Sequence, residues 1–246
     1  MSFSSSHSSS QLRAIITGAS SGIGEATTLT FAKAGINLAL ISRPSDKLKA
    51  VAKAAQEVGV LAQAYGIDLC QLAEIPGKVR QIADSFGGID IIVNNAGMGY
   101  TNRLADTSLS DWQKVMDLNL TSVFQCVRGI LPQMRKQGHG TIINVSSIAA
   151  SNTFTKWGAY SVSKAGLATF SRILAAEEQV NGIRIITINP GAVHTPIWDT
   201  DTVQVDFNRS AMLDPYTVAQ TILQAALLPA EAVIEEITIV PSAGTL

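Results

Sequence analysis

Short apolar segments alternate with longer amphipathic segments along almost the whole chain. The short segments are rich in isoleucine, valine and leucine, which is typical of buried strands. They predict strands at residues 12–17, 37–42, 61–68, 89–94, 141–146, 183–189 and 236–240. The segments between them carry apolar residues at helical spacing. They predict helices at residues 25–33, 45–58, 72–86, 110–137, 156–180 and 215–227.

This alternation of strands and helices indicates the fold class. Strands separated by helices form a parallel sheet, and right-handed crossovers place the helices on both of its faces. We therefore expect an α/β fold with a doubly wound, seven-stranded, mostly parallel sheet. No linker, charged run or repeat divides residues 12–246, so we expect a single domain.

Composition and charge change this picture little. The chain has 246 residues, is 46% hydrophobic and carries a net charge of −1, so it can bury a core and shows no sign of a nucleic-acid partner. Residues 1–11 contain seven serines and no apolar run, which predicts a flexible polar tail rather than a secretory signal. No segment approaches the ~18 apolar residues of a membrane span.

The cysteines and histidines do not suggest a metal site. Cys70 and Cys126 are far apart, and the three histidines fit no ligand spacing. We expect both cysteines to be small buried or half-buried side chains, no metal, and a reducing compartment such as the cytoplasm.

A glycine-rich turn, GASSGIG at residues 18–24, joins the first predicted strand to the first predicted helix. Its glycines let the backbone approach a pyrophosphate, and the start of the helix offers unpaired N–H groups. The turn therefore predicts a dinucleotide phosphate site. A tight strand-to-helix turn without a ligand is the alternative.

Tyr160 and Lys164 are four residues apart in a predicted helix, with Ser147 thirteen residues before the tyrosine. Residues at this spacing lie on the same helix face. A free tyrosine has a pKa near ~10, and a neighbouring ammonium lowers it, which suits a general acid or base near pH 7. A surface helical pair is the alternative. Several motif positions fall at the ends of predicted strands, where ligands bind in parallel sheets. They are Gly18, Ser42, Asp68, Asn94, Ser147 and Pro190.

These motifs together resemble the short-chain dehydrogenases/reductases. The resemblance covers Leu12 to Val240 and follows that family's order and spacings. It is carried by TGASSGIG at residues 17–24, Asn94-Asn95-Ala96-Gly97, Asn119, Ser147, Tyr160, Lys164 and Pro190-Gly191. It implies a Rossmann-type fold, hydride transfer with a nicotinamide cofactor, and a homo-oligomer, most often a tetramer and otherwise a dimer. Apolar helix residues beyond one buried face agree with this expectation. They are Val123, Phe124, Leu167, Phe170 and Leu174.

The resemblance also assigns catalytic roles. Tyr160 is the proton donor in reduction and the acceptor in oxidation, and Lys164 lowers its pKa and binds the nicotinamide ribose. Ser147 donates to the substrate oxygen, and Asn119 holds a water that links the lysine to solvent. Ser146 is the rival of Ser147, and Asn119 could instead bond its own backbone and kink a helix.

A larger set of residues is expected to bind the cofactor by the same resemblance. It comprises Gly18, Ser20, Ser21, Gly22, Ile23, Gly24, Ser42, Arg43, Asp68, Leu69, Asn95, Ala96, Gly97, Tyr160, Lys164, Pro190, Gly191, Val193 and Thr195. Asp68 matches the residue that meets the adenine amino group, although a strand-end turn is nearly as good an interpretation. Thr195 matches the residue that holds the nicotinamide carboxamide. For Asn94 we favour a structural role.

Arg43 indicates which nicotinamide cofactor is used. The second strand ends in Ser42-Arg43, without the carboxylate that would bond an adenosine ribose 2′-OH. A guanidinium makes a forked, charge-assisted contact with a 2′-phosphate. We therefore expect NADP(H) to be favoured over NAD(H). An ordinary exposed arginine is the alternative.

Substrate choice is expected to lie in residues 98–102, 148–159 and 192–213. Their apolar and aromatic members favour an uncharged ketone, aldehyde or alcohol. These are Met98, Tyr100, Phe154, Trp157, Trp198, Phe207 and Met212. His194 is interpreted as a plain loop histidine.

Two other functions remain open at this point. A 3-oxoacyl-[acyl-carrier-protein] reductase would grip its acidic carrier with two arginines, and the matching positions hold Gly138 and Asn181. Arg135, Lys136 and Arg184 lie nearby and could substitute for them. A non-catalytic nucleotide-binding regulator would usually break the Ser, Tyr and Lys set, which this chain keeps.

Overall fold

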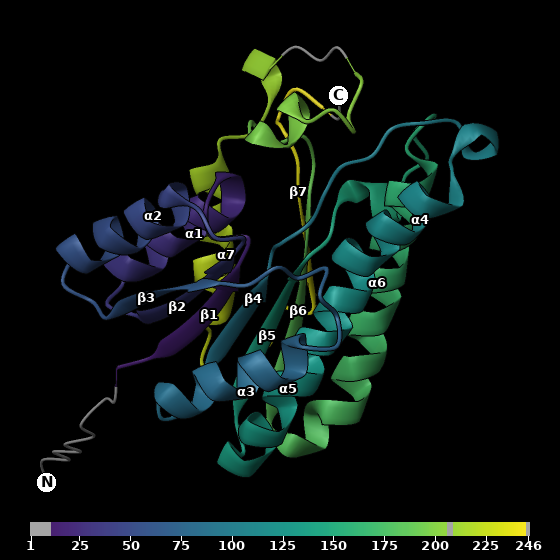
Figure 1. Ribbon diagram of the computed structural model, residues 1–246. Coiled ribbons are helices and arrows are strands. Elements are labelled where there is room, and N and C mark those ends of the chain that lie inside the picture. Colours follow the sequence, from purple (N-terminus) through teal and green to yellow (C-terminus); the bar gives the residue numbers. More distant parts are fainter. Residues whose placement is uncertain (1–10, 206–208, 245–246) are drawn as a thin grey trace, which may run out of the picture.

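The computed structural model describes residues 11–205 and 209–244 (Figure 1). All but one residue of the expected serine-rich tail, and Phe207, lie outside these residues. The seven strands are β1 (Arg13–Thr17), β2 (Asn37–Ser42), β3 (Ala62–Gly66), β4 (Ile91–Asn94), β5 (Gly140–Val145), β6 (Ile183–Pro190) and β7 (Glu236–Ile239). They form one sheet in the order β3-β2-β1-β4-β5-β6-β7, and every neighbouring pair is parallel. The expected α/β fold class is confirmed.

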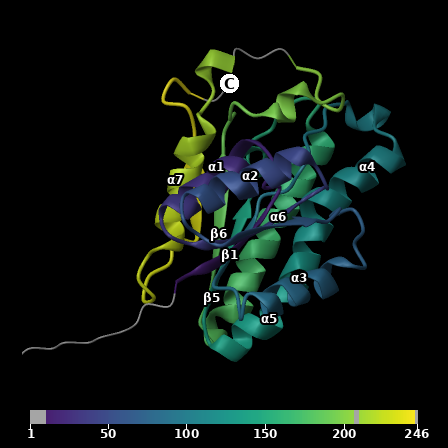
Figure 2. The ribbon, with the colours of Figure 1, turned by 60° about the vertical axis from the view of Figure 1, so that its left-hand side comes forward.

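Helices cover both faces of the sheet (Figures 1 and 2). The α-helices are α1 (Gly22–Lys33), α2 (Asp46–Glu57), α3 (Ile75–Ser85), α4 (Leu109–Met116), α5 (Ser122–Gln137), α6 (Gly158–Glu178) and α7 (Pro215–Ala226). Helices α1, α2 and α7 lie on one face, and α3, α5 and α6 lie on the other. None of the helices in the described ranges is both long and apolar enough to cross a membrane.

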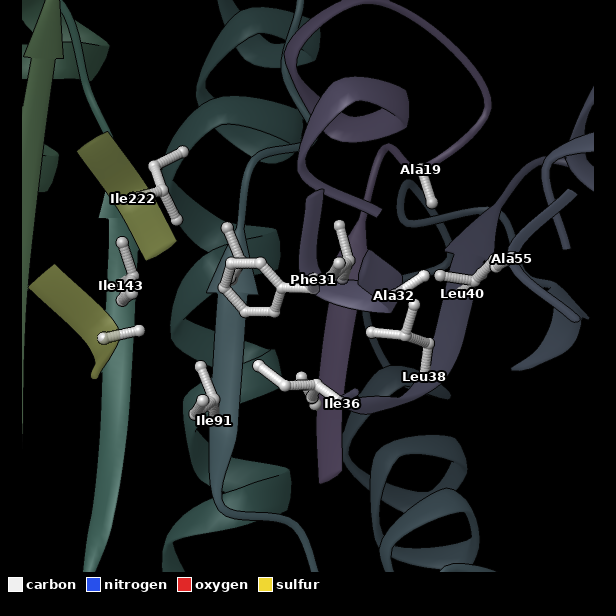
Figure 3. Packing of buried hydrophobic residues seen from close by; sticks show 14 of the residues in the cluster. Ala19, Phe31, Ala32, Ile36, Leu38, Leu40, Ala55, Ile91, Ile143 and Ile222 are labelled. Atoms are coloured by element: carbon white, nitrogen blue, oxygen red, sulfur yellow. The ribbon is translucent and has the colours of Figure 1, made fainter. Parts of the chain in front are cut away.

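The strands are apolar on both faces because both faces are buried. Ala14 and Ile16 of β1 pack with the α1, α2 and α7 layer, whereas Ile15 between them packs with the α3, α5 and α6 layer. This alternation follows from side chains that point to opposite faces along a strand. Figure 3 shows Phe31 of α1 in the first of these layers, near Ile36 and Ile91.

The strand order creates a switch point between β1 and β4. The chain moves outward from β1 to β2 and β3, and then returns to the other side of β1 as β4. Ligands of open α/β sheets bind outside the carboxyl ends of the strands at such a point. The glycine turn after β1 and the Asn94–Gly97 segment after β4 therefore flank the expected ligand position.

The long helical stretch expected at residues 110–137 is present, but it is not α-helical throughout. The structure divides it into α4 and α5, which are joined by a π-helical segment at Asp117–Thr121. Asn119 lies within this segment and is fully buried. Its side chain bonds a distant loop, which apolar spacing along the helix does not reveal.

The two cysteines differ from each other. Cys126 of α5 is buried, as expected, and burial raises the pKa of its thiol to about 12. Cys70 is exposed, so the expectation of a buried or half-buried side chain is wrong there. Cys70 follows β3 in a turn rather than a packed element, where no layer covers it.

Candidate active site

A cavity of about 790 Å³ opens along the carboxyl ends of the strands. Its size suits a dinucleotide with space for a small second molecule. Most of the site residues expected from the sequence line it. They are Gly18, Ser20, Ser21, Ile23, Ser42, Arg43, Asp68, Leu69, Asn95, Ala96, Gly97, Ser147, Tyr160, Lys164, Pro190, Gly191, Val193 and Thr195. Gly22, Gly24 and Asn119 are not among the lining residues.

The glycine turn is shaped by close backbone approaches. Gly18 and Gly22 have φ angles of +66° and +56°, which L side chains rarely adopt. A Cβ atom on Gly24 would lie 2.1 Å from the Gly18 carbonyl oxygen, so only glycine fits there. Ser21 precedes α1 without capping it through its side chain, so the first N–H groups of the helix lack that partner. These amides and the helix dipole fit the phosphates of a dinucleotide.

Hydrogen bonds join the glycine turn to the segment after β4. The Thr17 hydroxyl accepts from the backbone N–H groups of Asn95 and Ala96, both at 3.0 Å. The Asn95 side chain donates back to the Thr17 carbonyl at 3.0 Å. Asn94 is buried and donates to Asn144 Oδ1 at 2.9 Å, which bears out its structural role. The two sides of the switch point are therefore held at a fixed separation.

The end of β2 is polar and carries no carboxylate. The Ser20 and Ser42 hydroxyls are hydrogen-bonded at 2.8 Å, and Arg43 lines the cavity beside them. Asp68 Oδ1 accepts from the backbone N–H of Cys70 at 2.9 Å, so its carboxylate does stabilise a strand-end turn. Asp68 also lines the cavity, which leaves a cofactor contact open to it.

Tyr160 and Lys164 project from the first turns of α6. Lys164 is 4% exposed, and its Nζ donates to the Val145 carbonyl at 2.9 Å. The same Nζ lies 5.8 Å from the centroid of the Tyr160 ring. Burial lowers the pKa of Lys164 from 10.5 to about 8, because desolvation disfavours the charged ammonium.

The proton affinity of Tyr160 differs from the expectation. Burial raises the pKa of the Tyr160 hydroxyl, and a hydrogen bond with Ser147 acts in the opposite direction. The expected lowering by Lys164 is therefore not the dominant effect in this structure. Desolvation of the phenolate outweighs other influences, and the Lys164 ammonium is hydrogen-bonded to the backbone of β5.

The structure separates the two adjacent serines. Ser146 is buried, and its hydroxyl donates to the Lys164 carbonyl at 3.1 Å, which supports α6. The Ser147 hydroxyl accepts from the Ala149 N–H at 3.1 Å and interacts with Tyr160. Both serines line the cavity, and of the two it is Ser147 that interacts with Tyr160.

Asn119 is fully hydrogen-bonded to its surroundings. Its Oδ1 accepts from the Met98 N–H at 2.8 Å, and its Nδ2 donates to the Met98 carbonyl at 3.0 Å and to Ser163 Oγ at 3.1 Å. A Cβ atom on Gly97 would lie 3.1 Å from Asn119 Oδ1 and 3.6 Å from Lys164 Nζ. The Asn119 side chain therefore bonds another loop and α6 rather than its own backbone, so the alternative interpretation is wrong in that respect.

The apolar end of the cavity matches the expected substrate residues only in part. Met98, Phe154, Trp157 and Trp198 line the cavity. Tyr100 does not, because it packs with Val115 and Ala159 and its hydroxyl contacts Asp111 at 3.4 Å. Met212 and His194 line a separate, smaller recess.

Several lining residues were missed from the sequence. Lys114 and Leu118 reach the cavity from α4 and the π-helical segment. Their spacing of four residues places them on one helix face. Nothing in the sequence indicated that this face would lie at the carboxyl ends of the strands. Within the described ranges, His, Cys, Asp and Glu side chains form no cluster of three that could hold a metal ion.

Known proteins are similar to this chain in sequence. Residues 13–205 match the short chain dehydrogenase family. An uncharacterized oxidoreductase of Staphylococcus haemolyticus is 33% identical over 228 residues, which is 93% of this chain and 96% of that protein. Sepiapterin reductase of Chlorobaculum tepidum is 31% identical over 240 residues, or 94% of this chain and 97% of that enzyme.

A solved structure agrees with these relatives. An alcohol dehydrogenase from the archaeon Thermococcus sibiricus, complexed with 5-hydroxy-NADP, matches 96% of this chain and 99% of its own with a TM-score of 0.88 and 26% identity. The fold, the glycine turn at its switch point and the serine, tyrosine and lysine beside it lead to the same result as the sequence matches. This chain belongs to the short-chain dehydrogenase/reductase family, whose members are oxidoreductases that bind a nicotinamide cofactor.

Proposed function

We propose that this enzyme interconverts a ketone or aldehyde and the corresponding alcohol with NADP(H). The observation that carries the proposal is the set of residues that line one cavity. Ser147, Tyr160 and Lys164 line it together with the glycine turn and the start of α1. A phosphate site and a proton donor in the same cavity are what carbonyl reduction with a nicotinamide requires.

The roles of the side chains follow from their contacts. When bound, the cofactor supplies the hydride for reduction or accepts it in oxidation. Ser147 and Tyr160 hold the substrate oxygen, and Tyr160 gives it a proton as negative charge develops there. The Lys164 ammonium favours the phenolate left after that transfer. Asn119 fixes the loop at Met98 and is close enough to Lys164 to hold a water for proton return.

The preference for NADP(H) rests on Arg43 and on the missing carboxylate at the end of β2. Arg43 is exposed and lines the cavity beside the hydrogen-bonded Ser20 and Ser42 hydroxyls. Within the described residues no ion pair engages its guanidinium. A 2′-phosphate at this place would accept a forked contact from it. The neighbour from Thermococcus sibiricus was solved with 5-hydroxy-NADP, which is consistent with this choice.

The carrier-protein reductase alternative loses support from the arginines near its docking positions. Arg135 Nε donates to the buried Glu178 at 2.9 Å, and Asn181 donates to the same carboxylate at 2.9 Å. Arg184 donates to the Leu228 and Ala232 carbonyls at 2.8 and 3.0 Å. These arginines hold the fold together, so they are poorly available for gripping an acidic carrier.

Two further parts of the proposal concern the whole chain. We take residues 12–246 as one domain because a single sheet runs from β3 to β7. Unpaired cysteines and a nicotinamide-dependent activity suit the cytoplasm. We also propose a homo-oligomer, a tetramer or a dimer, which uses apolar residues left exposed on α5 and α6.

A spectrophotometric assay tests the proposal. Oxidation of NADPH at neutral pH is followed with a panel of uncharged ketones and aldehydes, and oxidation of the matching alcohols is followed with NADP at higher pH. We expect turnover of several members of the panel and none with an acyl-carrier-protein thioester. Tight NADPH binding without turnover of any carbonyl compound would favour the non-catalytic regulator instead.

A further inference from the structure

Two tryptophans stand beside the reacting tyrosine. The Trp157 ring lies edge-to-face with the Tyr160 ring at a centroid distance of 5.2 Å and an angle of 68°. Trp157 and Trp198 are in a similar arrangement at 5.8 Å and 72°. Both tryptophans line the cavity and are partly exposed, so part of each ring is open to it. Trp157, Trp198 and Tyr160 thus form a continuous aromatic wall.

The backbone directly before Trp157 is in a costly conformation. Lys156, directly before it, has a φ of +69° and is the only non-glycine residue in the described ranges with a positive φ. The Lys156 carbonyl accepts from the Asn102 N–H at 2.7 Å, which anchors this turn to the loop after β4. Such conformations cost free energy and persist where the surrounding structure fixes them, often at functional sites. The position of Trp157 is therefore specified rather than incidental.

Trp198 is fixed by different contacts. Its indole Nε1 donates to the Val193 carbonyl at 2.7 Å. The following residues are tied across the cavity mouth, because the Thr101 N–H donates to the Thr202 carbonyl at 2.9 Å and the Thr202 hydroxyl donates to the Gly99 carbonyl at 2.8 Å. A Cβ atom on Gly99 would lie 2.6 Å from Val203, so the two loops are in close contact. Both tryptophans are thus held by loops that bond to the segment after β4.

We propose that Trp157 and Trp198 are specificity-determining residues that select carbonyl substrates with a planar aromatic group next to the reacting carbon. The inference rests on the proposed function, because a carbonyl oxygen at Ser147 and Tyr160 places its substituents within ring contact of this wall. Aromatic pairs at centroid distances of about 4.5–7 Å stabilise each other beyond their buried area. That stabilisation corresponds to roughly two- to tenfold in binding or kcat/KM for each contact.

A matched pair of substrates isolates this effect. Phenyl methyl ketone and cyclohexyl methyl ketone have substituents of similar size, but only the first is planar and aromatic. Their intrinsic reactivities differ, so the informative quantity is how the ratio of their kcat/KM values changes between wild type and variants. We expect Trp198→Leu and Trp157→Leu each to lower the phenyl-to-cyclohexyl ratio by roughly three- to tenfold. Trp198→Phe should retain most of the wild-type ratio.

Trp112 supplies the control. It lies on α4 and packs against Tyr100 and Val115, and it is not among the residues that line the cavity. Trp112→Leu should leave the substrate ratio within about twofold of wild type. Thermal denaturation checks that each variant is folded. Trp157 directly precedes α6, so Trp157→Leu could fail to fold. In that case Trp198→Leu alone tests whether the aromatic wall selects the phenyl ketone.

The outcomes separate the two proposals. A ratio in Trp198→Leu equal to that of wild type overturns the aromatic wall while carbonyl reduction stands. A wild-type enzyme that reduces neither ketone, nor any other member of the panel, overturns both. A lowered ratio in Trp198→Leu that is absent in Trp112→Leu supports the wall.

Discussion

Burial controls the proton affinities of Tyr160 and Lys164. The spacing of Tyr160 and Lys164 predicted that they share a helix face, and the structure places both in the cavity with Ser147, which follows β5. The direction of the tyrosine pKa was not predictable from that spacing. It depends on how residues far apart in the sequence pack around α6 and remove the phenol from water.

Removing the Tyr160 hydroxyl should abolish turnover selectively. Tyr160→Phe keeps the ring and its contact with Trp157, so folding and NADPH binding should survive. Turnover should fall by about 10²–10⁴-fold, as is typical for loss of a general acid. Steady-state kinetics at saturating NADPH measures this. Ser146→Ala is the control, because its hydroxyl bonds the Lys164 carbonyl, and its main cost should be about 1 kcal/mol of stability. Near wild-type turnover in Tyr160→Phe would remove the tyrosine from the mechanism.

The buried lysine should leave a signature in the pH dependence of stability. Lys164 has a folded pKa of about 8 against 10.5 when unfolded, so between these values the unfolded chain binds the extra proton. The free energy of unfolding should therefore rise with pH between about 8 and 10.5, and this contribution should be constant below about 8, where both states are protonated. At about 1.4 kcal/mol per pKa unit, the cofactor-free protein should gain roughly 2 kcal/mol by pH 9.5.

Lys164→Met isolates this contribution. Urea denaturation of wild type and variant at pH 7 and pH 9.5 gives the difference in their free energies of unfolding. Relative to wild type, we expect Lys164→Met to have a higher free energy of unfolding at pH 7 than at pH 9.5. The same difference at both values would mean that Lys164 is not desolvated as the structure indicates.

Arg43 should decide between the two nicotinamide cofactors. A bidentate, charge-assisted contact contributes about 1.5–3 kcal/mol, or roughly ten- to a hundredfold in affinity. Arg43→Ala should weaken NADPH by that factor and leave NADH nearly unchanged, as measured by kcat/KM for each cofactor. Lys47→Ala, on the exposed side of α2, is a control for the general loss of positive charge. Equal preference in wild type, unchanged in Arg43→Ala, would contradict the assignment.

At the level of elements, the π-helical segment between α4 and α5 is the main feature that the sequence pattern missed. The apolar spacing of residues 110–137 is helical throughout, so it predicts a continuous helix. The π-helical turn holds Asn119, whose side chain bonds both backbone groups of Met98 in another loop. Apolar periodicity along the chain does not reveal contacts that form only in the folded structure. π-Helical turns are often found at functional sites.

Asn119 should therefore matter for stability as well as for activity. Asn119→Ala removes the partner of the Met98 N–H and carbonyl at a partly buried position, at up to about 1–3 kcal/mol for each group. We expect the free energy of unfolding to fall by roughly 2–5 kcal/mol in urea denaturation. Gln113→Ala on α4 is the control, because it loses only an exposed bond to Asp117 and should change stability by about 0.5 kcal/mol or less. A fully stable Asn119→Ala variant would assign the residue to catalysis alone.

At the scale of the whole molecule, the alternating pattern predicted the α/β class and placed the site at the strand ends. It did not give the strand order, because several parallel orders satisfy the same alternation and handedness. The order observed puts β1 next to β4, and this explains why the glycine turn and Asn95 meet although 77 residues separate Gly18 from Asn95. The site is therefore a property of the topology as much as of the motifs.

Part of the apolar surface left exposed by this fold lies on α5 and α6. Three of the residues expected to lie there, Val123, Leu167 and Leu174, are in the core instead. Phe124 remains 44% exposed and stacks edge-to-face with Phe170 at 6.2 Å. Val162 and Ile173 of α6 are 46% and 55% exposed, and with Gly166 and Phe170 they follow helical spacing along one stripe. Such a contiguous apolar stripe fits a self-association surface.

Charges placed on this stripe should dissociate the oligomer. Phe124→Glu combined with Ile173→Glu introduces carboxylates that a second copy would bury without partners, which is strongly unfavourable. Light scattering at micromolar concentration should give an oligomer mass for wild type and a monomer mass for the double variant. Leu61→Glu is the control, because Leu61 is 56% exposed beside β3 at the other edge of the sheet, and that variant should keep the wild-type mass. Circular dichroism confirms that all three proteins are folded. A monomeric wild type would contradict self-association altogether, whereas an oligomer that survives the double substitution would place the interface on a different face of the molecule.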